Sequence, residues 1–175
     1  MNEKIILNTI ELNIILERLC YQLIESHNDF SNTVLIGLQP RGVFFARKII
    51  DKLSVITLNK KIKYGELDST FFRDDFRRKK EVLKPSNTNI DFLVENKRVV
   101  LIDDVLYTGR SIRSSLDSIG SFGRPKSIEL LILINRRFSR EIPIHPKYIG
   151  RSVDVINLER VKVDWDKQNV LLLNE

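Results

Sequence analysis

Two adjacent carboxylates stand a few residues before a run of small hydrogen-bonding residues near the middle of the chain. Asp103 and Asp104 follow the aliphatic run 99–102, and residues 108–111 read Thr-Gly-Arg-Ser. An uninterrupted aliphatic run is typical of a strand buried on both faces of a parallel sheet. Apolar residues at helical spacing follow from Ile112, so we expect a tight loop to join this strand to the N-terminus of a helix.

This strand, loop and helix have the chemistry of a ribose 5-phosphate site. Backbone N–H groups at a helix N-terminus hold phosphate, Gly109 lets the backbone approach closely, and the Thr108 and Ser111 hydroxyls add hydrogen bonds. Asp103 and Asp104 are placed to bind ribose hydroxyls, directly or through Mg²⁺. The alternative is a buried strand with ordinary surface acids, but packing alone explains two adjacent acids there poorly. The predicted phosphate-binding residues are Val105, Leu106, Tyr107, Thr108, Gly109, Arg110 and Ser111.

A second tight loop repeats this arrangement earlier in the chain. Residues 34–38 predict a buried strand and residues 43–52 predict a helix. Because parallel strands end at the same edge of a sheet, both loops are expected to open there. The Arg41 guanidinium, a planar fork of N–H donors, suits pyrophosphate; the alternative is a surface arginine after a proline turn. The predicted pyrophosphate-binding residues are Gln39, Pro40, Arg41 and Gly42.

The composition of the chain narrows its class. Its 175 residues fit one domain, and 42% hydrophobic with 30% charged residues is ordinary for a globular protein. One cysteine excludes an intramolecular disulfide, and with two histidines it argues against zinc. No apolar run reaches the roughly 18–20 residues of a membrane span, and no signal-peptide pattern is present, so we expect a cytoplasmic protein without membrane contact. The net charge of +6 favours anionic ligands and permits nucleic acid.

Periodicity predicts the elements that position these loops. A helix capped by Thr9 is expected to run to about His27, and residues 127–134 are expected to form a further buried strand. Residues 73–97 are polar and basic without clear periodicity, which favours a lid that orders over substrate, with a short strand near residues 90–92. Shorter β-like segments are predicted at residues 55–58, 61–72, 148–150, 161–163 and 170–173.

Residues 99–111 resemble the ribose-phosphate signature of the type I phosphoribosyltransferases: four hydrophobic residues, two acids, two aliphatic residues, any residue, then Thr-Gly-Arg-Ser. Residues 39–42 resemble the pyrophosphate loop of that family, in which one peptide bond is often strained or cis. The resemblance implies a three-layer α/β fold, with a mainly parallel central sheet flanked by helices, a small hood and a flexible lid loop. It implies one domain over residues 1–175, with the lid at about 73–97 and the hood at about 136–175 plus the N-terminal segment. The catalytic residues that it implies are Asp103, Asp104 and Arg73.

Further motifs are similar to those of the pyrimidine-operon attenuation regulators that double as uracil phosphoribosyltransferases. The similarity extends from about residue 35 to about residue 163, and its most specific piece is Gly-Glu-Leu-Asp at 65–68 ahead of Arg-Asp-Asp at 73–75. The resemblance implies 5-phosphoribosyl-1-pyrophosphate (PRPP) and uracil as substrates, UMP and pyrophosphate as products, Mg²⁺ as cofactor, and a homodimer or higher homo-oligomer. The other matching motifs are Arg-Gly at 41–42 with Ala-Arg at 46–47, Gly-Arg-Pro at 123–125, Arg-Glu-Ile-Pro-Ile at 140–144 and Tyr-Ile-Gly-Arg at 148–151.

Tyr107 gives an independent argument for a pyrimidine base. Similar enzymes that act on 6-oxopurines carry Asp at this position as a partner of a purine ring nitrogen, and a tyrosine, with an ordinary pKa of about 10, does not act as a carboxylate. Their purine-reading lysine aligns with Asn135, and the chain has Asn135-Arg136 where the regulators have Asp-Arg. The predicted base-binding residues, at the end of the 127–134 strand and in the hood, are Asn135, Arg136, Asn157 and Leu158.

A basic turn after the 127–134 strand indicates a competing class of function. The regulators bind leader mRNA through a basic dimer face, with UMP tuning the affinity, and a solvated basic loop is the alternative. Arginines that contact phosphates make such binding depend on salt. Two other functions stay open: a non-catalytic nucleotide-sensing RNA-binding attenuator, and a phosphoribosyltransferase for another base. The candidate RNA-binding residues are Arg136, Arg137, Arg140, His145, Lys147 and Arg151.

Overall fold

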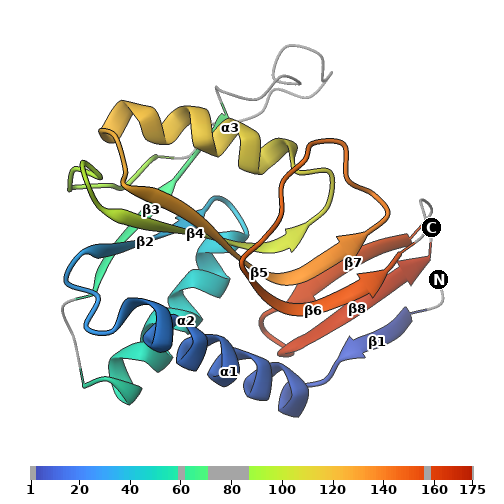
Figure 1. The fold of residues 1–175 in the computed structure, drawn as a ribbon. Coiled ribbons are helices and arrows are strands. Elements are labelled where there is room, and N and C mark those ends of the chain that lie inside the picture. The colour runs from blue at the N-terminus through green and yellow to red at the C-terminus, as the bar shows by residue number, and fades with distance from the viewer. Residues whose placement is uncertain (1–2, 59–61, 71–86, 156–158, 175) are drawn as a thin grey trace.

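The computed structural model describes residues 3–58, 62–70, 87–155 and 159–174 of the chain. Within them, five strands form a parallel sheet in the order β3-β2-β4-β5-β6, and three form a small antiparallel sheet in the order β1-β8-β7 (Figure 1). The parallel strands are β2 (Thr33–Leu38), β3 (Lys63–Leu67), β4 (Arg98–Leu106), β5 (Ser127–Arg137) and β6 (Tyr148–Asp154). The antiparallel strands are β1 (Glu3–Leu7), β7 (Glu159–Asp164) and β8 (Asn169–Asn174). The helices are α1 (Thr9–His27), α2 (Gly42–Ile56) and α3 (Arg110–Ile119), with a 3₁₀ turn (Gly120–Phe122) after α3.

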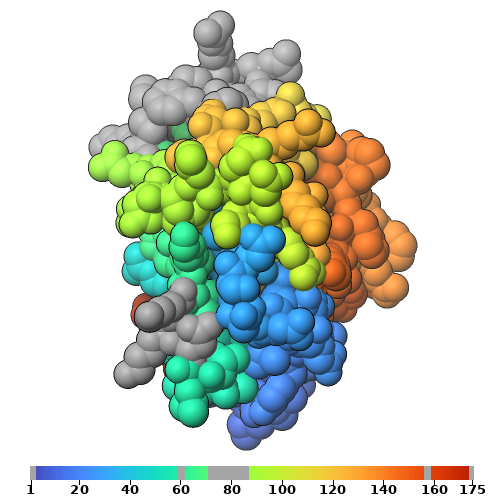
Figure 2. Space-filling model, turned by 60° about the vertical axis from the view of Figure 1, so that its left-hand side comes forward, coloured from blue at the N-terminus to red at the C-terminus, as the bar shows by residue number. Residues whose placement is uncertain are grey.

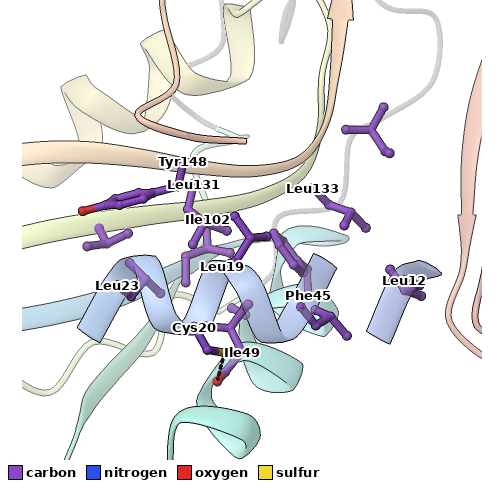
Figure 3. Packing of buried hydrophobic residues seen from close by; sticks show 14 of the residues in the cluster. Leu12, Leu19, Cys20, Leu23, Phe45, Ile49, Ile102, Leu131, Leu133 and Tyr148 are labelled. Carbon is purple, nitrogen blue, oxygen red and sulfur yellow. Dashed lines mark hydrogen bonds between the residues drawn. The ribbon is translucent and has the colours of Figure 1, made fainter. Parts of the chain in front are cut away.

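Helices α1 and α2 cover one face of the parallel sheet and α3 covers the other, so the predicted three-layer α/β fold is confirmed (Figure 1). Successive side chains of a strand point to opposite faces. The aliphatic run of β4 is therefore buried on both faces of the sheet: Val100 and Ile102 pack toward α1 and α2, and Val99 and Leu101 pack toward α3. Figure 3 shows the α1 and α2 side, where the labelled apolar residues include Leu12, Leu19, Leu23, Phe45, Ile49, Ile102, Leu131 and Leu133.

The N-terminus of α1 carries a capping box. The Glu11 backbone N–H donates to Asn8 Oδ1, and the Asn8 backbone N–H donates to Glu11 Oε2, both over 2.9 Å. The helix ends at His27 as predicted, but its cap is Asn8 and not Thr9. Asn at the N-cap with Glu three positions on satisfies two helix N–H groups at once, which is why the helix begins one residue earlier than a Thr9 cap requires.

Three predicted short strands differ from the structure. Residues 55–56 belong to the last turn of α2, because Val55 is 73% exposed while Leu53, two positions earlier, is fully buried. Near residues 90–92 there is only an isolated bridge between Asn89 and Glu66. Residues 148–150 begin β6, which pairs in parallel with β5 and so belongs to the main sheet instead of the predicted hood. Residues 73–86 of the predicted lid lie outside the described residues.

A partly buried ionic network closes the edge at which the parallel strands begin. In Figure 2 the blue residues before β2, the yellow-green residues before β4 and the amber residues before β5 lie next to one another, and the Arg98 N–H donates to the Asn32 carbonyl over 2.9 Å. Glu129 accepts hydrogen bonds from Tyr148 (2.7 Å) and Lys147 (2.8 Å), and its carboxylate lies 3.1 Å from His27 Nε2. Although burial acts to raise the pKa of Glu129, these hydrogen bonds hold that pKa at about 2.

Glu129→Gln is expected to lower the free energy of unfolding at pH 7 by roughly 2–3 kcal/mol. Because the pKa of Glu129 is depressed in the folded protein, its carboxylate stabilises the fold above pH 4.5, and that contribution is lost as the pH falls toward 2. Urea unfolding of both proteins from pH 7 to pH 3 should show the difference shrinking in acid, whereas Glu25→Gln, an exposed control on α1, should show little difference at any pH. A Glu129→Gln deficit that does not change with pH would contradict this assignment.

Candidate active site

The two predicted loops meet at one edge of the parallel sheet. β2 and β4 are neighbours and run parallel, with Gly37 opposite Ile102, so the loops that follow them leave the same edge side by side. Gly42, the first residue of α2, lies against the end of β4. A Cβ at this position would stand 2.6 Å from the Ile102 carbonyl oxygen and 2.8 Å from Asp103 Oδ1. The predicted pyrophosphate loop therefore touches the predicted ribose-binding carboxylates.

Asp103 and Asp104 form a largely buried acidic pair near the end of β4. Asp104 is 6% exposed, and its backbone N–H donates to Asp103 Oδ1 over 3.0 Å. Burial raises the pKa of Asp103 well above its usual range, and the charge of Asp104 raises it further. Burial also raises the pKa of Asp104, while the nearby Arg41 guanidinium acts to lower both. Such a pair gains most from hydroxyl donors or from a cation, because either compensates buried negative charge.

The loop between β4 and α3 leads into a helix N-terminus that no described side chain caps. Gly109, the N-cap residue, has a φ of 91°, a left-handed backbone conformation that glycine adopts without steric cost. The side-chain hydrogen bond that the Arg110 backbone N–H makes to Thr108 Oγ1 is long at 3.4 Å. Since the first N–H groups of a helix have no partner within the helix, this turn has the donors that a phosphate requires.

Gly109→Ala is expected to lower the free energy of unfolding by about 1–2 kcal/mol, because a Cβ is disfavoured in left-handed backbone. The cost is conformational, since no neighbouring atom lies within 3.5 Å of the added Cβ. As the loop relaxes, affinity for ribose 5-phosphate should fall about tenfold, because its amides no longer point at one spot. Urea unfolding and titration calorimetry measure the two effects. Gly109→Asn, which tolerates left-handed backbone, should lose less of both, and equal losses would argue against the backbone explanation.

The basic turn after β5 holds the outer side of the phosphate loop. The Glu141 and Ile142 backbone N–H groups donate to the Thr108 carbonyl over 3.0 and 3.2 Å. Arg140 donates to the Tyr107 carbonyl, and Arg110 Nε donates to Glu141 Oε2 over 2.5 Å. Sequence reasoning missed this contact, because it assigned these residues to a basic turn that either binds RNA or is solvated. The motif at 140–144 marked the segment but did not indicate that it contacts the phosphate loop.

Arg136 is a buried cation at the same edge. Only 6% of its surface is exposed, and its guanidinium carbon lies 4.0 Å from the centroid of the Tyr107 ring. Burial lowers the pKa of Arg136, although the charges of Tyr107 and Glu159 act to raise it. Within the described part of the chain, Nε and Nη2 of Arg136 have no hydrogen-bond partner. Buried N–H donors are rarely left unpaired, so this guanidinium is a candidate for contact with a ligand.

Of the predicted base-binding residues, Asn135 is engaged within the chain. Its Oδ1 accepts from Arg140 over 2.7 Å, and its Nδ2 donates to Ser152 Oγ over 3.3 Å. Gln39 is also engaged, because its side-chain amide donates to the Asn87 carbonyl over 2.8 Å. The Gln39–Pro40 peptide bond is cis, and Arg41 is exposed beside it. Three further predicted residues, Arg73, Asn157 and Leu158, lie outside the described residues.

The six candidate RNA-binding residues differ in their contacts within the chain. Arg137 forms a bidentate pair with Asp154 at 2.6 and 2.7 Å, and Lys147 belongs to the Glu129 network. Arg151 donates to the Ile6 carbonyl over 2.8 Å. Arg136 and Arg140 face the phosphate loop as described above, and His145 is exposed. These residues are close to one another in the sequence, but their side chains have separate partners.

The described residues contain neither a preformed metal site nor a helix that could span a membrane. No group of three or more His, Cys, Asp or Glu side chains is arranged to hold a metal ion by itself in residues 3–58, 62–70, 87–155 and 159–174. Across those same residues, none of the helices combines the length and apolarity of a membrane span.

Comparison with known proteins agrees with this geometry. A model of the phosphoribosyl transferase domain matches residues 3–168. The bifunctional protein PyrR of Elusimicrobium minutum is 40% identical over 174 residues, covering 98% of this chain and 96% of that protein. The protein of the same name from Streptococcus mutans is 37% identical, covering 99% and 97%.

Solved structures support the fold. The hypoxanthine phosphoribosyltransferase of Trypanosoma cruzi superposes with a TM-score of 0.75, at 14% identity, over 98% of this chain and 96% of that chain. A hypoxanthine phosphoribosyltransferase from Staphylococcus aureus gives a TM-score of 0.67 at 19% identity, over 86% and 77%. At these identities the structures establish a shared architecture only. The family resemblance read from residues 39–42 and 99–111 is confirmed by the domain match and the relatives: this chain belongs to the phosphoribosyl transferase domain family and, within it, to the bifunctional PyrR proteins.

Proposed function

We propose that this chain transfers the 5-phosphoribosyl group of PRPP to uracil, forming UMP and pyrophosphate. The observation that carries the proposal is the contact of Gly42 with Ile102 and Asp103. Through it, an acid pair, a helix N-terminus rich in N–H donors and an exposed arginine share one edge of the sheet. These three features match the three anionic or hydroxylated parts of PRPP. Membership of the bifunctional PyrR family supports the same assignment.

Each part of PRPP has its proposed residues. Residues 105–111, which include Thr108, Gly109 and Ser111, hold the 5′-phosphate, and Asp103 and Asp104 hold the ribose hydroxyls. Arg41 and the main chain of residues 39–42 hold the pyrophosphate. The Gln39 side chain ties this loop to residue 87 through its hydrogen bond to the Asn87 carbonyl.

The donor set fits a magnesium ion that arrives with the substrate. Asp103 and Asp104 offer hard carboxylate oxygens, and the described residues offer no third carboxylate or imidazole beside them. Mg²⁺ characteristically takes one or two protein carboxylates and completes its shell with substrate oxygens and water. When bound here, it would supply positive charge against the diphosphate and the acid pair.

In the proposed reaction the bond between ribose C1 and the pyrophosphate oxygen breaks, and its electron pair leaves with pyrophosphate. Uracil N1 forms the new bond to C1 and gives up its proton. Positioning and electrostatics supply most of the catalysis: the acid pair fixes the ribose, the loop fixes the 5′-phosphate, and Arg41 faces the leaving group. We assign Arg73 to the charge that develops on pyrophosphate, and the predicted lid to the exclusion of water. Residues 94–97 are not part of that lid, because Val94 is fully buried and its backbone N–H donates to the Phe122 carbonyl over 3.0 Å.

Arg136 is the proposed contact for the base. Uracil presents two carbonyl oxygens that accept hydrogen bonds, and Arg136 carries two buried nitrogens without partners among the described residues. Tyr107 stacks on this guanidinium instead of offering a carboxylate to a purine nitrogen. Asn157 and Leu158 remain proposed base contacts. Asn135 is better placed to support Arg140 than to read a base, because Arg140 and Ser152 occupy its amide.

A base screen tests the proposal directly. The protein is incubated with PRPP, Mg²⁺ and one of uracil, orotate, hypoxanthine or guanine, and pyrophosphate release is measured. Uracil should give the highest kcat/KM. Pyrophosphate release with hypoxanthine but not with uracil would replace the base assignment. If none of the four bases led to pyrophosphate release, a non-catalytic nucleotide sensor would be favoured.

We also propose that the chain binds leader mRNA in a UMP-responsive way, in the cytoplasm and as a homodimer or higher homo-oligomer. The net charge of +6 favours this second function, and so does the name bifunctional that the relatives carry. Titrating a pyrimidine leader RNA across salt concentrations, with and without UMP, tests it. Saturable binding that weakens with salt and tightens with UMP is expected, and no saturable complex at low salt would remove the regulatory role.

A further inference from the structure

A loop that binds phosphate through its N–H groups must turn its carbonyl oxygens away from the anion. A carbonyl oxygen that faced the phosphate would repel it, and a peptide plane that rotates freely does not keep its N–H group directed at the anion. In this chain both carbonyls at the start of the loop are held from outside. The Tyr107 carbonyl accepts from Arg140, and the Thr108 carbonyl accepts from the Glu141 and Ile142 N–H groups.

Arg140 joins two strands through one rigid group. One guanidinium nitrogen donates to the Tyr107 carbonyl, just after β4, and another donates to Asn135 Oδ1 near the end of β5 over 2.7 Å. Its Cδ would lie 3.5 Å from a Cβ at Gly109, so the side chain runs along the back of the loop. A planar fork bound at two points fixes the spacing of its acceptors more tightly than a single flexible donor does.

We infer that Arg140 is a positioning residue of the transferase site: it holds the Tyr107 carbonyl outward and keeps the 5′-phosphate loop in place against the base-proximal end of β5. This inference rests on the proposed function and assigns Arg140 a role in the transferase site, while the prediction that Arg140 contacts RNA stays a prediction. The two acceptors are neutral, so the guanidinium keeps its positive charge close to the loop that receives the phosphate. Arg140 does not touch the substrate in this account.

The test compares Arg140→Gln with Arg113→Gln. Both variants remove one arginine charge close to the loop, but the Arg113 side chain pairs with Asp117 along the surface of α3 at 3.3 Å. Titration calorimetry uses two probes: ribose 5-phosphate for the 105–111 loop, and inorganic pyrophosphate with Mg²⁺ for the 39–42 loop. Arg140→Gln should bind ribose 5-phosphate about tenfold to a hundredfold more weakly, with pyrophosphate affinity unchanged, because only one loop loses its orientation.

Arg140→Lys separates geometry from charge and serves as the main variant if Arg140→Gln does not fold. Lysine keeps the positive charge but presents no planar fork. The affinity of Arg140→Lys for ribose 5-phosphate should therefore lie between those of the unaltered protein and Arg140→Gln. In steady-state assays, KM for PRPP should rise more than KM for uracil.

The outcomes distinguish this inference from the proposed function. If Arg140→Gln binds ribose 5-phosphate as Arg113→Gln does, or Arg140→Lys matches the unaltered protein, the positioning role is wrong while the transferase proposal stands. If the unaltered protein binds ribose 5-phosphate but forms no UMP, the transferase proposal fails while the comparison still decides what Arg140 does to the loop. If the unaltered protein binds neither probe, both are overturned.

Discussion

Replacing Asp103 with Asn is expected to lower kcat/KM for PRPP by about a hundredfold to a thousandfold, because a preorganised charge at the reacting centre is removed. The same change should make the unliganded protein more stable. An amide has the size of the carboxylate and retains one hydrogen-bond acceptor, so the Asp104 N–H keeps its partner. The variant therefore separates the carboxylate's charge from its packing.

The gain in stability follows from the direction of the pKa shift. Burial, with the charge of Asp104, raises the pKa of Asp103 well above the 3.8 of an exposed aspartate. The folded protein therefore holds this proton more tightly than the unfolded chain does, and Asp103 destabilises the fold increasingly as the pH rises above 3.8. Asn removes that cost, so the midpoint of thermal unfolding at pH 7 should rise by about 2–4 °C for each kcal/mol released. The difference should vanish as the pH approaches 4.

Measurement needs thermal scans from pH 4 to pH 8 alongside UMP-forming assays. Asp117→Asn is the matched control, since Asp117 is half-exposed on α3 and forms a salt bridge with Arg113. It should change neither quantity noticeably. Asp104→Asn should lower activity like Asp103→Asn, because both carboxylates face the same ribose in the proposed site. Full activity in both single variants would remove the acid pair from the mechanism.

The sequence located the site because its strongest signals are local. A buried strand, two acids, a glycine turn and a helix follow one another within thirteen residues, so residues 99–111 predicted the ribose-phosphate half without any long-range information. The pyrophosphate loop at 39–42 needed one further step, the rule that parallel strands end at a common edge. The contact of Gly42 with Asp103 is the physical consequence of that rule.

Contacts between side chains that are far apart in the sequence could not be predicted from it. Arginines in a basic turn are normally solvated, so nothing in the pattern indicated that Arg136 is buried against Tyr107 or that Arg140 spans two strand ends. The predicted strand at 55–58 failed for another reason. A β-branched run of a few residues fits a strand and the last turn of a helix equally well, and here the burial of Leu53 at helical spacing decided for α2.

The second large effect is expected from Gly42→Ala. A Cβ at this position would stand 2.6 Å from the Ile102 carbonyl oxygen and 2.9 Å from Asp103 Cα, distances that real Cβ atoms do not adopt. Both neighbours are backbone atoms of the central strand β4, so no side chain can rotate to make room. Alanine gains at most about 1 kcal/mol in helix propensity over glycine, while overpacking costs typically about 1–3 kcal/mol, so the clash dominates.

In Gly42→Ala, the clash with β4 is relieved when the start of α2 moves away from that strand. That shift carries Arg41 and the 39–42 loop with it, and kcat/KM for PRPP should fall about a hundredfold, the loss expected when reacting groups move by roughly 1 Å. Pyrophosphate affinity should fall with it, while affinity for ribose 5-phosphate should change little. Gly120→Ala is the matched control, because a Cβ there meets nothing within 4 Å and its backbone is right-handed helical. If Gly42→Ala kept full activity with PRPP, the contact between the two loops would have no part in the reaction, and the observation that supports the transferase proposal would lose its force.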